Sequence, residues 1–129
     1  MTDLAWLTVA EGAQLLRAKK LSPVEWTKAL LDRIAAIDSS YNAFLVVTAD
    51  KALAQAKAAE AEIAHGQWRG PMHGVPYAAK DIFDVESMAT TCHSKIRNNR
   101  ARNPASHKNM DEKREVASEV MVGHRRRYI

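Results

Sequence analysis

The segment that most constrains the fold runs from Gly70 to Lys80 and reads Gly-Pro-Met-His-Gly-Val-Pro-Tyr-Ala-Ala-Lys. It holds two of the five glycines and two of the four prolines in the chain, and both residue types interrupt helices. Val75 precedes a proline, which favours an extended backbone. The apolar run that follows therefore predicts a tight loop leading into a short buried strand, with Lys80 at its far end.

Lys80, which is followed directly by Asp81, is the candidate functional residue. We expect a lysine at the end of a buried strand to lose water, and a desolvated amine can act as a general base. The alternative is an exposed lysine that pairs with Asp81 or Asp84. The residues of this segment alone leave both interpretations open.

Two capping signals predict a helical hairpin before this segment. Thr8 to Glu11 and Ser22 to Glu25 both match the capping-box pattern, in which a hydroxyl residue is followed three positions later by glutamate. The first helix is expected to run to about Lys20 and the second to about Ile37, because apolar residues recur at helical spacing in both.

A strand and a third helix are predicted between the hairpin and the loop. Tyr41 to Thr48 is rich in aromatic and β-branched residues, which favours a strand. Asp50 is expected to cap a helix from Lys51 to about His65, ended by Gly66. This helix is rich in alanine, and its small apolar face would let it lie close to a sheet or to another helix.

The last part of the chain has a different composition. Residues 1–96 carry ten Lys and Arg against eleven Asp and Glu, whereas residues 97–129 carry nine against four. Dense charge and few apolar residues predict disorder here, or a marginal helix over residues 108–121. The basic residues could contact nucleic-acid phosphates, but no aromatic residues are interleaved with them, so nucleic-acid binding is not favoured.

Several classes of protein are excluded by composition. Cys92 is the single cysteine, so no internal disulfide can form, and this fits a reducing cytoplasmic compartment. No apolar run approaches the roughly 20 residues of a membrane span, and the first residues do not match a signal peptide. The spacing of the one cysteine and the histidines does not match a zinc site, so no metal is expected. The histidines are interpreted as surface and loop residues: His65, His73, His93, His107 and His124.

The segment Gly70 to Asp81, together with Thr90, Thr91 and Ser94, resembles the N-terminal part of the amidase signature family. The resemblance extends over residues 4–96 and then stops. It implies an α/β fold, in which a mixed sheet is covered by helices, and of which this chain holds an incomplete N-terminal portion. We therefore divide the chain into residues 1–96, which match the family, and a basic tail over residues 97–129 that does not.

The resemblance also implies a mechanism. The family hydrolyses the C–N bond of small-molecule carboxylic amides with a Ser–cis-Ser–Lys triad and without a metal or organic cofactor, and Lys80 takes the position of the lysine. Both serines of the triad lie in a glycine-rich segment downstream of the lysine, whereas only Gly123 follows Gly74 here. The remaining serines do not match that segment: Ser87, Ser94, Ser106 and Ser118.

We therefore expect an inactive chain that keeps only the lysine of the triad. The abrupt loss of the family pattern after residue 96 indicates a truncated or frameshifted product, and His93 also departs from the small residues that are common before Ser94. The alternative is a non-catalytic pseudo-enzyme or a basic-tailed interaction protein. The sequence leaves open whether the parent activity is that of a general amidase or of a glutaminase-type subunit that serves transfer-RNA amidation.

Overall fold

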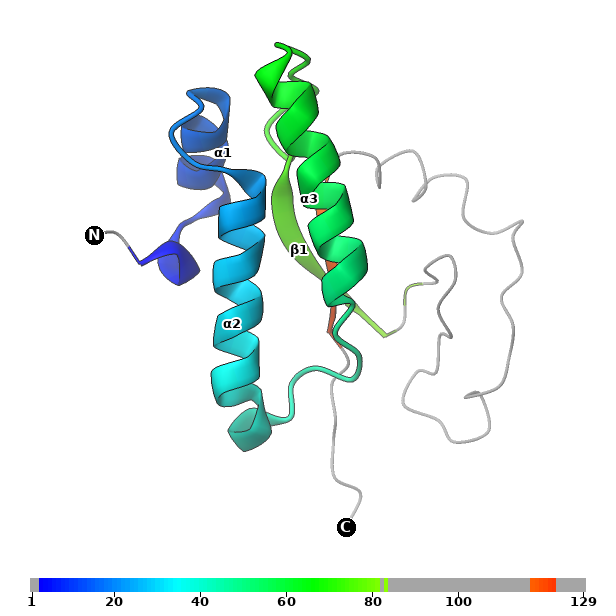
Figure 1. The fold of residues 1–129 in the computed structure, drawn as a ribbon. Helices are drawn as coiled ribbons and strands as arrows, with labels where there is room; N and C mark the ends of the chain where they lie inside the picture. Colours follow the sequence, from blue (N-terminus) through cyan, green and yellow to red (C-terminus); the bar gives the residue numbers. More distant parts are fainter. Residues whose placement is uncertain (1–2, 82, 84–116, 123–129) are drawn as a thin grey trace, which may run out of the picture.

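The computed structural model describes residues 3–81, 83 and 117–122. The elements in chain order are η1 (Leu4–Trp6), α1 (Val9–Arg17), α2 (Pro23–Tyr41), α3 (Ala49–Ala64), β1 (Val75–Lys80) and β2 (Ala117–Val122). Helices α2 and α3 lie side by side in opposite directions, and β1 passes along this helical pair (Figure 1). The described part is thus a helical layer packed on a two-stranded sheet. None of its helices is long and apolar enough to cross a membrane.

The predicted capping signals do begin the first two long helices. The Thr8 side chain accepts from the backbone N–H of Glu11, and the Glu11 carboxylate accepts from the Thr8 backbone N–H at 2.9 Å, so the capping box is complete. At α2, Ser22 Oγ accepts from the backbone N–H groups of Val24 and Glu25 at 3.0 and 3.2 Å. Both caps satisfy amides that a helix cannot pair internally.

The capping box makes the stability of α1 depend on pH. The side-chain hydrogen bond from Thr8 and then the Thr8 backbone N–H hold the pKa of Glu11 below its usual value. A lowered folded-state pKa gives stability that is present above the unfolded-state pKa and is lost as pH falls through the folded-state pKa. We expect the thermal stability of the chain, relative to that of a Glu11→Gln variant, to be unchanged at neutral pH and to fall as the pH drops below the ordinary glutamate pKa of 4.5.

Glutamine keeps the shape of the capping box but does not titrate, so it is the matched control in this comparison. Melting curves followed by circular dichroism at the helical wavelength measure the difference. Parallel pH profiles for the two proteins would contradict the role of the Glu11 carboxylate.

The predicted strand at Tyr41 to Thr48 is wrong. Helix α2 continues to Tyr41, and Asn42 then ends it in the left-handed conformation with φ of 50°. The Asp38 carboxylate accepts from the backbone N–H groups of Ala43 and Phe44 at 2.8 and 3.2 Å. These bonds provide partners for the amides after the helix, so the segment forms a capped turn although its residues favour a strand. Helix α3 also begins slightly before its predicted start, at Ala49.

Part of the predicted C-terminal helix is also wrong. Residues 117–122 form strand β2, which pairs in parallel with β1 in the register Val75 to Ala117 through Lys80 to Val122. Pairing with β1 and packing against α3 give this short segment partners that its own sequence does not reveal. The other residues of the predicted tail lie outside the described residues.

The core joins all three long helices to β1. Leu16, Leu21, Trp26, Ile63 and Val75 form one buried apolar cluster. The predicted small-residue face of α3 is confirmed, because three of its alanines are buried beside Ile63: Ala52, Ala56 and Ala59. Packing of α3 against this cluster fixes the start of β1, and hence the strand that carries Lys80.

Candidate functional site

The loop before β1 needs glycine where it meets the helices. Gly74 has a positive φ of 78°, which a side chain would disfavour. A Cβ at this position would also lie 2.9 Å from Cγ of Pro23 and 3.5 Å from Cδ1 of Ile63. The loop backbone therefore packs directly on the start of α2 and the end of α3, and the strand leaves from this contact.

A buried histidine connects the same loop to α3. The side chain of His73 is fully buried, and its Nδ1 accepts from the backbone N–H of Arg69 at 3.2 Å. Nε2 of His73 lies 2.9 Å from Oε2 of Glu62. Because Nδ1 accepts, Nε2 carries the proton and donates to the carboxylate, which defines a neutral tautomer of the ring. Arg69 pairs with the other carboxylate oxygen of Glu62 at 2.5 Å.

The interpretation of His73 as a surface or loop histidine is therefore wrong with respect to its burial. It lies in the predicted loop, but its ring is packed at 5.8 Å from the Trp68 ring and bonded on both nitrogens. The interpretation is confirmed for His65, which is exposed at the end of α3. The remaining histidines, His93, His107 and His124, lie outside the described residues, as does Cys92.

Strand β1 confirms the predicted extended segment and places Lys80 at its last position. The strand begins buried, at Val75, and Ala79 is buried as well, whereas Ala78 and Lys80 are exposed. The expected loss of water from Lys80 is thus not produced by the described residues. The Lys80 carbonyl accepts from the backbone N–H of Phe83 at 3.0 Å, which turns the chain directly after the strand.

The structure does not bring a second catalytic group to Lys80 among the residues that it describes. Asp81 is buried beside it and has interactions of its own. Thr90, Thr91 and Ser94, which belong to the family pattern, lie outside the described residues, as do Asp84 and the other serines beyond the strand. Within the described ranges, no group of three or more histidines, cysteines or acidic residues could hold a metal ion.

Sequence reasoning missed the Glu62–His73 pair. The two residues are separated by the end of α3 and the loop, so no local periodicity connects them. One signal was present in the sequence: His73 directly precedes Gly74, in the tight loop before β1. A side chain at this position either faces solvent or packs inside the loop. The pair serves to position β1 and lies at the opposite end of the strand from Lys80.

Most of this chain matches known proteins in sequence and in fold. A family model described as Amidase matches residues 25–108. The chain is 49% identical over 96 residues to a glutamyl-tRNA(Gln) amidotransferase subunit of Acidothermus cellulolyticus, and the match covers 74% of this chain and 19% of the relative. The chain therefore spans about a fifth of the length of the curated relatives that it matches.

Solved structures show the same fold. The peptide amidase of Stenotrophomonas maltophilia superposes on 93% of this chain with a TM-score of 0.76 and 29% identity, over 24% of its own length. A bacterial aryl acylamidase of the amidase signature enzymes superposes on 91% with a TM-score of 0.77 and 26% identity, over 25% of its length. This chain belongs to the amidase signature family, and its α/β structure matches the N-terminal part of that fold.

Proposed function

We propose that Lys80 is the proton-transferring lysine of an amide-hydrolysing site, and that the described residues supply this lysine but no nucleophile. The observation that carries the proposal is the position of Lys80, at the last residue of a strand fixed by Gly74 and His73, within a segment matched by the family model. The proposed reaction is hydrolysis of a C–N bond in a carboxylic amide.

The described residues can perform one part of this chemistry, which is to hold the amine in place. Burial of Val75 in the core and the contact of Gly74 with Pro23 fix the start of β1, so the strand carries Lys80 on a rigid support. A lysine base takes a proton from a nucleophile or a relay hydroxyl and later returns it to the leaving amine. Both steps require exclusion of water from the amine, which the described residues do not provide.

The substrate is proposed only at the level of the bond that breaks. The similar proteins include a peptide amidase, an aryl acylamidase and an amidotransferase subunit, so their names share the amide bond and differ in what surrounds it. A small-molecule amide is consistent with all three. A cytoplasmic location also stays a prediction, based on the use of a single cysteine.

The purified chain alone is expected to release no ammonia from aliphatic or aryl amides above the uncatalysed rate, because the residues that the structure describes bring no serine to Lys80. Loss of a nucleophile leaves only the weak effects of binding groups. Ammonia release should be measured with a coupled assay for the chain and for a Lys80→Ala variant, with a full-length amidase as the positive control. Turnover by the chain that disappears in the variant would show that this chain has a complete site of its own.

A further inference from the structure

Three residues around the loop before β1 form a closed ring of polar contacts. The backbone N–H of Arg69 donates to Nδ1 of His73 at 3.2 Å. Nε2 of His73 lies 2.9 Å from Oε2 of Glu62, and the guanidinium of Arg69 pairs with Oε1 of the same carboxylate. Arg69 therefore supplies both ends of the ring, one from its backbone and the other from its side chain.

A backbone group determines which atoms of this ring carry protons. A peptide N–H can only donate, so Nδ1 of His73 must accept and Nε2 must carry the proton of the neutral imidazole. That proton lies toward a carboxylate oxygen of Glu62, which accepts it. Both partners thus require the same tautomer. Because the imidazole is fully buried, loss of either partner would leave a ring nitrogen without a hydrogen bond.

The ring also closes the loop that leads into β1. Within this loop the backbone N–H of His73 donates to the Gly70 carbonyl at 3.0 Å, so the chain turns tightly between Arg69 and the histidine. The ring spans this turn and connects it to α3, because Glu62 belongs to that helix. Val75, the first residue of β1, is therefore positioned by these hydrogen bonds as well as by its burial in the apolar core.

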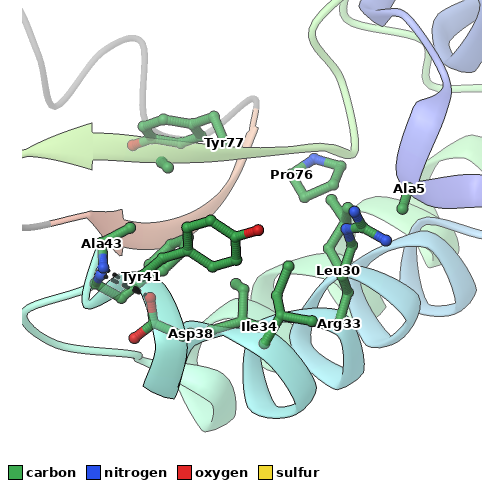
Figure 2. A pocket seen from close by; sticks show the side chains of 12 residues that line it. Ala5, Leu30, Arg33, Ile34, Asp38, Tyr41, Ala43, Pro76 and Tyr77 are labelled. Atoms are coloured by element: carbon green, nitrogen blue, oxygen red, sulfur yellow. Dashed lines mark hydrogen bonds between the residues drawn. The ribbon is translucent and has the colours of Figure 1, made fainter.

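Apolar packing is less complete on the side of β1 that faces α2. A groove of about 370 Å³ runs between this helix and the strand. Figure 2 shows the Tyr41 ring between helix and strand, with Pro76 and Tyr77 on the opposite wall. Ala78 also lines the groove, and both Ala78 and Lys80 are exposed. Within the described residues, the course of the strand toward Lys80 therefore depends on its pairing with β2 and on the anchor at its start.

We propose that Glu62 is a positioning residue for Lys80 and acts through the single tautomer of His73 that the ring requires. This inference depends on the amide-hydrolysing role proposed above for Lys80. The lysine lies at the far end of β1, roughly 17 Å from Val75, so a small rotation at the start of the strand moves its end further. A displacement of about 1 Å at a reacting group can lower a rate about a hundredfold, so the ring influences turnover without touching the substrate.

The hydrogen bond between His73 and Glu62 is tested first, in the isolated chain. Long-range proton–nitrogen NMR distinguishes the two neutral tautomers of an imidazole, and a His73→Asn variant identifies the signals of His73. We expect the Nε2–H tautomer with a slowly exchanging ring proton. Glu62→Gln can still accept from Nε2–H and should retain this signal, whereas Glu62→Ala should lose it. Glu60→Ala, at an exposed position of the same helix, is the matched control and should retain it.

Kinetics in a full-length chimera test the effect on Lys80. In this chimera, the matched residues of this chain replace those of the Acidothermus cellulolyticus relative. We expect Glu62→Ala to lower kcat for amide hydrolysis by at least about tenfold and to leave KM within about twofold, because the variant displaces the lysine and not the substrate. Glu62→Gln should restore most of kcat, and Glu60→Ala should leave both constants unchanged.

Several results would overturn the positioning role. They are an Nδ1–H tautomer of His73, a folded Glu62→Ala chimera with unchanged kcat, and a loss of kcat that Glu62→Gln does not restore. If Glu62→Ala does not fold, His73→Asn decides, because its Oδ1 still accepts from the Arg69 N–H but no longer reaches Glu62. A reduced kcat in folded His73→Asn supports the proposal, and an unchanged kcat overturns it. Activity that survives Lys80→Ala would instead reject the proposed function, and the positioning role would fall with it.

Discussion

A Gly12→Ala variant is expected to be less stable than the unchanged chain by about 2–3 kcal/mol. In an exposed helix the same change stabilises by about 1 kcal/mol, because alanine is the better helix former. The opposite sign is expected here because Gly12 is buried in α1, and a Cβ at this position would overlap Cη2 and Cζ3 of the Trp26 ring. Trp26 cannot easily move away, since it is only 3% exposed and its Nε1 donates to the Leu4 carbonyl at 3.0 Å.

Urea denaturation followed by circular dichroism measures this effect. Ala10→Gly, at an exposed position of the same helix, reports the cost of helix propensity alone, and we expect it to lose about 1 kcal/mol. Combining Gly12→Ala with Trp26→Phe removes the overlapping ring atoms, so the double variant should lose less than the sum of the two single losses. Gly12→Ala with a stability equal to or above that of the unchanged chain would refute this account of the α1–α2 contact.

Local signals in the sequence were sufficient for the helix starts and for β1. The caps at Thr8 and Ser22 depend on residues within three positions, and the loop before Val75 depends on glycine and proline. Such features act through the nearby backbone, so they keep their effect in any tertiary context. The predicted position of Lys80 at a strand end followed from the same local chemistry.

Features that depend on side-chain contacts or strand pairing formed only in the folded chain could not be predicted. The Asp38 side chain caps the turn after α2 and overrides the strand preference of the residues that follow. Gly12 is visible in the sequence only as a weak point in a helix, because Trp26 reaches it from another element. Strand β2 forms through pairing with β1, which lies far away in the sequence.

The candidate site shows the same division. The position of Lys80 at the end of a strand could be predicted from the apolar run before it. Its exposure could not, because exposure depends on which segments cover β1. Burial of His73 depends on Glu62 and Trp68, which approach it only in the folded chain. The sequence alone therefore predicted that Lys80 lies at a strand end, but not which residues surround it or how exposed it is.

Replacing Lys80 is expected to have the largest effect on activity once the fold is completed. The full-length chimera carries the matched residues of this chain in place of those of the Acidothermus cellulolyticus relative. In this chimera, Lys80→Ala should lower amide hydrolysis by at least about 10³-fold, because a positioned acid–base group contributes roughly 10²–10⁴ and Lys80 is proposed to act in two successive proton transfers. We expect the chimera to fold because the two chains are 49% identical over the matched residues. Lys57→Ala, on the exposed face of α3, is the matched control and should leave the rate unchanged.

The rate of ammonia release by this chimera, with and without Lys80→Ala, tests the central claim most directly. The substrate is chosen as an amide from which the unmodified relative releases ammonia in a parallel control assay, and circular dichroism establishes that each variant is folded. We predict an active chimera, an active Lys57→Ala variant and an inactive, folded Lys80→Ala variant. A folded Lys80→Ala variant that retains the activity of the chimera within about tenfold would contradict the assignment of Lys80 as the proton-transferring residue of an amidase site.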